Sequence, residues 1–344
     1  MVGGGKGELG TCTLPLVEKY RPAQLDEIIS QGNIVNTLTR LIDEQRLPHL
    51  LFYGPPGTGK TSTILACARR MFGAQRMSSM MLELNASDDR GIDVVRNQIK
   101  TFASTQQIFS NGVKLVVLDE VDAMTSAAQF ALRRIIEKYT RTTRFCLIAN
   151  YTNKIIPALQ SRCTRFRFAP LSIAEATKKA VSIAELERID LTQDGVGAIM
   201  ELANGDMRKV LNMLQTVNAA YGQVNGDNVH TCTGTPRPID IEESLSHLLN
   251  SPFGEACAAL SQLMNARGLC LSDIVTRLVP LVCAVDDLPA GVLAFAVSQL
   301  ADLEYRLSSE TCERIQLVAL VSIFLMVRDR TVHHYAAAEA AAAQ

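Results

Sequence analysis

The sequence contains no tryptophan, no C-x-x-C pair and no long apolar run. Its nine cysteines are scattered singly, so we predict neither a zinc site nor a disulfide framework and expect a reducing compartment. The longest apolar stretch, residues 315–327, is shorter than the about 20 residues that span a bilayer, and MVGGGKGELG lacks the apolar stretch of a secretory signal. We therefore expect a nuclear or cytosolic protein with no membrane partner.

A large net charge is also missing. The 344 residues include 34 Lys and Arg against 35 Asp and Glu, an ordinary globular composition that excludes a disordered chain or a bulk polycation. The charges are unevenly distributed: residues 1–170 hold 22 basic against 14 acidic side chains, which leaves 12 against 21 for residues 171–344. We expect an anionic partner to bind the basic half.

Short apolar runs alternate with amphipathic stretches between residues 50 and 168. The runs LLFYG, MLELNA, KLVVLDE and RFCLIAN are each followed by a helical pattern. This alternation predicts a parallel sheet covered by helices, an α/β core. After Pro170 the strand signals stop, and residues 172–220 show helical periodicity that is broken at Asp190, at Gly195 and at Asn204-Gly205.

The chain length predicts two or three domains. The Pro-rich segment TGTPRPID marks a linker at residues 235–238, beyond which apolar residues recur at helical spacing and predict a bundle. We expect a flexible N-terminus over 1–13, the α/β core over 14–170, a small helical domain over 171–234, a helical bundle over 239–332 and an Ala-rich tail over 333–344.

The segment GPPGTGKT, Gly54–Thr61, fits the phosphate-binding pattern G-x-x-x-x-G-K-[ST] between a predicted strand and a predicted helix. Backbone N–H groups of such a loop point at phosphates, while Lys60 reaches the β and γ oxygens and the Thr61 hydroxyl ligates Mg²⁺. The alternative is a chance Gly-rich turn. The predicted ATP-binding residues of this segment are Gly54, Pro55, Pro56, Gly57, Thr58, Gly59, Lys60, Thr61 and Ser62.

Two further strand ends carry polar side chains suited to ATP hydrolysis. KLVVLDE ends with Asp119, which we expect to hold Mg²⁺ with Thr61, and Glu120, which we expect to act as general base. Asn150 ends FCLIAN, where its amide would orient the attacking water or touch the γ-phosphate. The alternatives are a solvated pair of carboxylates and an ordinary turn asparagine in NYTN.

Four more segments narrow the interpretation: VEKYRP at Val17–Pro22, LELNASDDRGID at 82–93, IIPALQSRCTRFRF at 155–168 and GDMR at Gly205–Arg208. With the P-loop and LDEVD they resemble AAA+ ATPases of the clamp-loader group, and among them the small subunits of replication factor C. The subunit numbered three in fungi and five in animals is the most similar one, as judged from the segments SDDRGID, FAST (102–105) and GDMRKVLNMLQ. The sequence departs from many relatives at Leu16, where they carry Trp.

The resemblance covers roughly residues 14–235 closely and the helical remainder more loosely. It implies a P-loop core, a helical lid and an all-helical collar that joins subunits. It also implies that Arg162 is an arginine finger acting in trans on a neighbour's ATP, and that Arg208 approaches the γ-phosphate from the lid. The adenine and ribose side is implied to be lined by Val17, Tyr20, Arg21 and Pro22. The sequence alone equally allows Arg162 to lie on a solvated strand edge and Arg208 to be a charge on a helix surface. It also allows the residues of Val17–Pro22 to pack on the core in the ordinary way.

The family also implies macromolecular partners. Its members work with other replication factor C subunits, the PCNA sliding clamp and primer-template DNA bound without base reading. Candidate DNA contacts are Arg90, Arg96 and Lys100, for which a solvated helix face is the alternative. Candidate clamp contacts are Ile99, Phe102 and Ala103, for which core packing is the alternative.

The sequence therefore predicts an ATP hydrolase, with ATP and Mg²⁺ as cofactors, that acts in a nuclear hetero-oligomer, most simply a pentamer, to open PCNA and load it on DNA. One alternative is a scaffold subunit that binds ATP without turning it over. Another is a hexameric AAA+ helicase or branch-migration motor, for which no translocation loop is evident.

Overall fold

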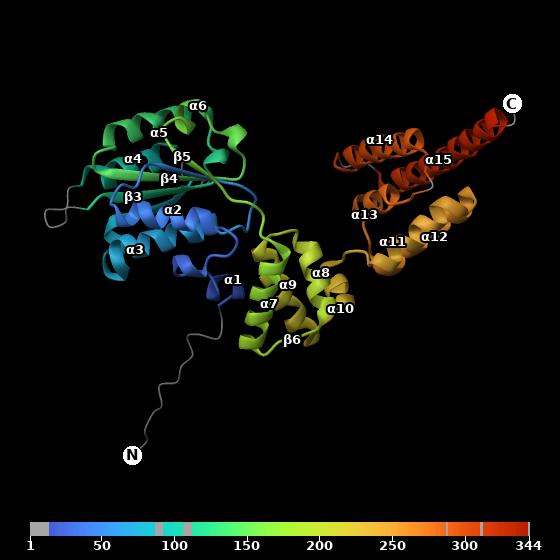
Figure 1. Ribbon diagram of the computed structural model, residues 1–344, viewed down its shortest axis with the longest axis horizontal. Helices are drawn as coiled ribbons and strands as arrows, with labels where there is room; N and C mark the ends of the chain where they lie inside the picture. The colour runs from blue at the N-terminus through green and yellow to red at the C-terminus, as the bar shows by residue number, and fades with distance from the viewer. Residues whose placement is uncertain (1–13, 87–91, 106–111, 287, 310–311, 343–344) are drawn as a thin grey trace, which may run out of the picture. The chain divides into compact units, whose positions relative to one another are not determined.

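A computed structural model describes residues 14–86, 92–105, 112–286, 288–309 and 312–342; the side chains of 92–96 and 338–342 are outside the description. The predicted N-terminal segment 1–13 lies outside these ranges. The chain divides into two compact units, Met1–Gly226 and Asp227–Gln344 (Figure 1).

The first unit is built on a five-stranded parallel sheet. Its strands are β1 (Leu50–Tyr53), β2 (Met81–Asn85), β3 (Lys114–Asp119), β4 (Thr143–Ala149) and β5 (Thr164–Arg167), in the order β2-β3-β4-β1-β5. The predicted α/β core is thus confirmed. No apolar run announces β5, because TRFR alternates Arg with other residues and three of its four side chains are exposed.

Alternate residues of the central strands enter two separate cores, as the period of two along a strand requires. Leu50, Phe52 and Val117 pack with helices on one face, whereas Leu51, Val116 and Leu118 pack with helices on the other. The first face is covered by α2 (Gly32–Asp43) and α3 (Lys60–Met80), and the second by α4 (Ile92–Ser104) and α5 (Ser126–Tyr139) (Figure 1). Burial on both faces explains why these strands are continuously apolar.

A helical region follows the sheet within the same unit. It consists of α7 (Ile173–Glu187), α8 (Gln193–Ala203) and α9 (Met207–Tyr221), with two short paired strands, β6 (Asp190–Leu191) and β7 (Gln223–Val224). The predicted helix break at Gly195 is wrong, because Gly195 lies inside α8. A Cβ there would stand 2.3 Å from the Val224 carbonyl oxygen, so the glycine permits close packing instead of ending the helix.

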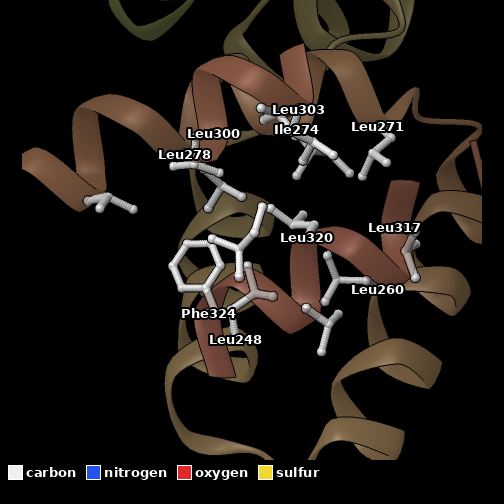
Figure 2. Close-up of a cluster of buried hydrophobic side chains, with 14 of the residues drawn as sticks. Leu248, Leu260, Leu271, Ile274, Leu278, Leu300, Leu303, Leu317, Leu320 and Phe324 are labelled. Atoms are coloured by element: carbon white, nitrogen blue, oxygen red, sulfur yellow. The ribbon is translucent and has the colours of Figure 1, made fainter. Parts of the chain in front are cut away.

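The second unit is helical, as predicted: α10 (Gly226–Thr233), α11 (Pro238–Asn250), α12 (Phe253–Arg267), α13 (Leu271–Cys283), α14 (Ala290–Leu307) and α15 (Glu313–Ala342). Leu271, Leu300, Leu320 and Phe324 are among the buried side chains of its core (Figure 2). Among the helices of the described ranges, none is long and apolar enough to cross a membrane.

The division between the units falls earlier in the chain than the predicted linker at residues 235–238. Arg237 forms ion pairs with Asp227 of α10 at 3.1 Å and with Asp240 of α11 at 3.2 Å, and Arg267 of α12 reaches Asp240 at 3.3 Å. Asp240 is 1% exposed, so its charge depends on these two arginines. The ion pairs tie α10 to the second unit.

Candidate nucleotide-binding site

The glycine-rich loop connects β1 to α3, and three of its glycines have backbone angles that favour glycine. The φ angles of Gly54, Gly57 and Gly59 are 144°, 69° and 90°. A Cβ on Gly57 would stand 1.6 Å from Oδ1 of Asp206, and one on Gly54 would stand 2.2 Å from the Phe168 carbonyl oxygen. Gly54 and Gly57 are therefore required by close packing against the residue after β5 and the start of α9, whereas Gly59 is favoured by its positive φ alone.

Lys60 is the best-anchored charged group of the site. Its Nζ donates to the carbonyl oxygens of Gly54 and Pro55, both at 2.8 Å, and to Oδ1 of Asn150 at 2.9 Å. The side chain is 7% exposed. Burial, partly offset by the negative charge of Asp119, lowers the pKa of Lys60 to about 8.

Thr61 and Asp119 bring together oxygen ligands of the kind that Mg²⁺ prefers. The Thr61 hydroxyl donates to Oδ2 of Asp119 at 2.8 Å, although the residues come from the start of α3 and the end of β3. A hydroxyl and a carboxylate beside a phosphate cradle form a hard-oxygen donor set, so these residues fit the predicted metal. The next residue, Glu120, is exposed and adopts a left-handed φ of 55° at the end of the strand.

The lid helix α9 begins at the same site. Asp206 caps it by accepting from the backbone N–H groups of Arg208 at 2.9 Å and Lys209 at 3.4 Å. Arg208 is exposed and lines the pocket, and its charge also helps to lower the pKa of Lys60. Two cations, Lys60 and Arg208, therefore line the same pocket as the carboxylates of Asp119 and Glu120.

One pocket brings most of the predicted nucleotide residues together. Within the residues that the structure describes, its lining includes the following predicted set: Val17, Tyr20, Arg21, Pro22, Pro56, Gly57, Thr58, Gly59, Lys60, Thr61, Ser62, Asp119, Glu120, Asn150 and Arg208. Gly54 and Pro55 contribute their carbonyl oxygens to Lys60 instead.

The apolar part of this lining was not predicted from the sequence. Ile28 and Ile29 follow a short 3₁₀ turn, and Leu171, Met207 and Leu211 come from the lid. Ile28, Ile29 and Leu171 belong to no motif, because any apolar side chain of similar size fills the same wall. Met207 and Leu211 lie within GDMRKVLNMLQ, and their spacing of four residues, which places them on one face of a helix, is the signal that could have identified them.

The segment Leu16–Pro22 reaches the pocket while bound to the lid helices. The backbone N–H of Leu16 donates to Oε1 of Gln215 on α9 at 2.9 Å. The Tyr20 hydroxyl donates to Glu187 on α7, whose carboxylate also pairs with Lys19 at 2.6 Å. These bonds lower the pKa of Glu187 and raise the pKa of Tyr20.

Arg162 is not among the pocket residues. It follows α6 (Pro157–Gln160), and its exposed guanidinium pairs with Glu137 of α5 at 2.6 Å and donates to the Ala158 carbonyl oxygen at 2.8 Å. Its own chain therefore holds Arg162 outside the pocket that the other predicted nucleotide residues line.

The predicted DNA contacts are only partly described. Arg90 lies outside the described residues. Arg96 lies in α4, but its side chain is outside the description; Lys100 lies in the same helix and is half-buried.

The predicted clamp contacts need a correction. Ile99 and Ala103 are 1% and 4% exposed, and Ile99 packs in the core beneath α4. The structure contradicts a direct clamp contact for these two residues because they have almost no accessible surface. Phe102 is half-buried against the same core, with the ammonium of Lys114 4.8 Å from its ring centre.

The sequence matches two family models. Residues 50–171 match the ATPase family associated with various cellular activities (AAA), and residues 236–322 match the replication factor C C-terminal domain. Solved structures show the same fold more distantly: a point mutant of Thermotoga maritima RuvB has a TM-score of 0.51 at 15% identity, covering 75% of this chain and 91% of that one.

Curated relatives are much closer in sequence. The chain is 52% identical to replication factor C subunit 5 of Homo sapiens, covering 93% of this chain and 94% of that protein. It is 49% identical to subunit 3 of Schizosaccharomyces pombe over 90% of both, and 48% identical to subunit 3 of Saccharomyces cerevisiae over 90% and 92%. The chain therefore belongs to the replication factor C subunit family, and its similarity is to the subunits numbered five in animals and three in fungi.

Proposed function

We propose that this protein is an ATPase subunit of a nuclear clamp loader that uses ATP binding and hydrolysis to open PCNA and load it onto primer-template DNA. One observation carries the ATPase assignment. Lys60 is bonded to Asn150 at 2.9 Å and Thr61 to Asp119 at 2.8 Å, so residues from α3, β3 and the end of β4 meet in one pocket.

The residues divide the work of binding and hydrolysis. The P-loop N–H groups and Lys60 bind the phosphates, while Thr61 and Asp119 would hold Mg²⁺, which would neutralise charge on the phosphate oxygens. Glu120 follows Asp119 at the exposed rim and accepts a proton from the attacking water. Asn150 accepts a hydrogen bond from Lys60 and lines the pocket together with Arg208, where both side chains would contact the terminal phosphate.

Turnover belongs to an assembly of several replication factor C subunits. Arg162 is exposed and absent from the pocket of its own chain, so we propose that it completes the ATP site of an adjacent subunit. The helical second unit, which matches the replication factor C C-terminal domain, joins the subunits. This role fits a five-membered loader. The likeness to RuvB, at 15% identity, concerns the fold alone and so does not support a hexameric motor.

DNA and clamp bind through the first unit in this proposal. Arg96 and Lys100 lie in α4, and Arg90 precedes them in the basic half of the sequence; we propose that all three contact phosphates without reading bases. Phe102 is the remaining candidate for the clamp contact, because Ile99 and Ala103 serve the core.

The direct test is PCNA loading onto singly primed circular DNA by a reconstituted assembly that contains this chain. We expect wild-type protein to load PCNA in an ATP-dependent reaction, and Lys60→Ala and Glu120→Gln to reduce loading. Full loading by Glu120→Gln together with loss by Lys60→Ala would identify an ATP-binding scaffold. No loading by any form would overturn the proposal.

A further inference from the structure

The guanidinium of Arg162 is held by acceptors of its own chain. Nη2 lies 2.6 Å from Oε1 of Glu137. Nη1 donates to the Ala158 carbonyl oxygen at 2.8 Å and lies 3.5 Å from the Ser161 hydroxyl. The Arg162 side chain retains a relative exposure of 34%. It is therefore fixed on one side and open to solvent on the other.

Glu137 is itself well anchored. It lies in the last turns of α5, next to Ile135 and Ile136, which are buried in the core. Nε of Arg133, one helical turn earlier, donates to the same oxygen of Glu137 at 3.1 Å. That hydrogen bond and the two nearby arginines lower the pKa of Glu137, which favours its carboxylate form.

The contact leaves Arg162 able to bind phosphate. A guanidinium has five N–H donors in a planar fork, and the Glu137 and Ala158 oxygens use one on each terminal nitrogen. Within the described residues, Nε–H and the second N–H of Nη2 remain for an incoming oxyanion, while the second N–H of Nη1 has only the distant Ser161 hydroxyl at 3.5 Å. The two contacts fix the plane of the guanidinium and leave some of its N–H donors available. Such an arrangement suits a guanidinium that must bind a transition state in one orientation.

We propose that Glu137 is a positioning residue for Arg162, holding its guanidinium in the direction from which it meets the ATP of the adjacent subunit. This inference rests on the proposed function, in which Arg162 acts in trans. Glu137 touches neither nucleotide nor substrate and acts only through Arg162.

The test measures steady-state ATP hydrolysis by the full chain, co-assembled with its small-subunit relatives, in the presence of PCNA and primed DNA. The Arg162-dependent rate is the difference between the wild-type rate and the rate of Arg162→Ala. We expect Glu137→Gln to lower the kcat of this part by about twofold to fivefold, as expected for losing a partly exposed ion pair, and to leave KM for ATP unchanged. Adding Glu137→Gln to Arg162→Ala should cause no further loss.

Matched variants separate positioning from a structural role. Asp43→Asn breaks an exposed carboxylate–arginine pair of 3.0 Å with Arg70, in a helix outside the site, and should leave kcat unchanged. Glu137→Asp, which keeps the charge on a shorter side chain, should give an intermediate rate and serves if Glu137→Gln fails to assemble. Native mass spectrometry checks that every variant enters the assembly.

The outcomes distinguish the two proposals. A full rate for Glu137→Gln beside a reduced rate for Arg162→Ala overturns the positioning role alone. An additive loss in the double variant also overturns it, because Glu137 would then act through the fold. A full rate for Arg162→Ala contradicts the trans role itself, and with it the basis of this inference.

Discussion

Nζ of Lys60 lies 2.9 Å from Oδ1 of Asn150, and this bond joins the P-loop to the end of β4. The two residues are 90 positions apart, yet β1 and β4 are neighbours in the sheet, so their carboxyl ends meet at the same edge. Ligand sites of open parallel sheets form at this edge. The bond therefore places Asn150 within reach of any phosphate that Lys60 binds.

Lys60→Ala should weaken ATP binding by roughly 10- to 100-fold, the cost of losing a hydrogen bond to a charged phosphate. Calorimetric titration of ATP into the purified chain measures this. Circular dichroism of the variant provides the folding control, since Lys60 also donates to two loop carbonyls. Undiminished affinity in a folded variant would remove Lys60 from the site.

ATP affinity should fall as the pH rises through about 8, because burial lowers the pKa of Lys60 to that value. Below it the ammonium is charged and pairs with phosphate; above it the neutral amine dominates. Bound phosphates favour the charged form, so binding takes up protons near pH 8. Titrations in buffers of different ionisation enthalpy measure the uptake.

The control for this pH dependence is Lys60→Arg, whose guanidinium stays charged throughout. The variant should bind ATP with an affinity that changes little between about pH 7 and pH 9, values that bracket the pKa of about 8. An identical fall in both proteins would assign the pH dependence to another group.

Gly57→Ala should destabilise the first unit more than Gly222→Ala does. Both glycines have positive φ angles, 69° and 75°, so each alanine carries backbone strain of about 1 kcal/mol or more. Only at Gly57 does the new Cβ meet Asp206, 1.6 Å from Oδ1, whereas Gly222 has open space. Thermal unfolding compares them, and equal shifts would show that the Asp206 contact is easily relieved.

Tyr20→Phe should weaken ATP binding by a few fold, although the hydroxyl contacts Glu187 and not the predicted phosphate site. Loss of one hydrogen bond, worth about 1 kcal/mol, loosens the segment that forms the pocket wall. Calorimetry measures the affinity. Tyr221→Phe, an exposed tyrosine on the last turn of α9, is the matched control and should bind like wild type.

The phosphate side of the site was predictable because its chemistry demands particular residue types at fixed spacing. Glycines, Lys60 and Thr61 form one contiguous motif, and Asp119 and Asn150 end apolar strands that buried parallel sheets require. The apolar wall on the adenine side of the pocket was harder to predict. Ile28 and Leu211 line the same pocket only after folding, and an apolar wall restricts the size of its side chains without requiring a particular residue type.

The predictions that were wrong, for Gly195, Ile99 and Ala103, failed because of packing around each residue that the sequence does not show. Gly195 resembled a helix break, but its missing Cβ makes room for the Val224 backbone within α8. Ile99 and Ala103 share a helical face with Phe102, and a periodic pattern does not say whether such a face meets the core or a partner. Burial decides the question for the first two.

The most direct test of the account is the ATPase rate of this protein co-assembled with its small-subunit relatives, with and without PCNA and primed DNA. The account predicts stimulation by clamp and DNA that is partly lost in Glu120→Gln, which removes the base of its own site, and in Arg162→Ala, which removes the arginine given to a neighbour. No stimulation, or indifference to both changes, would contradict clamp loading through shared active sites.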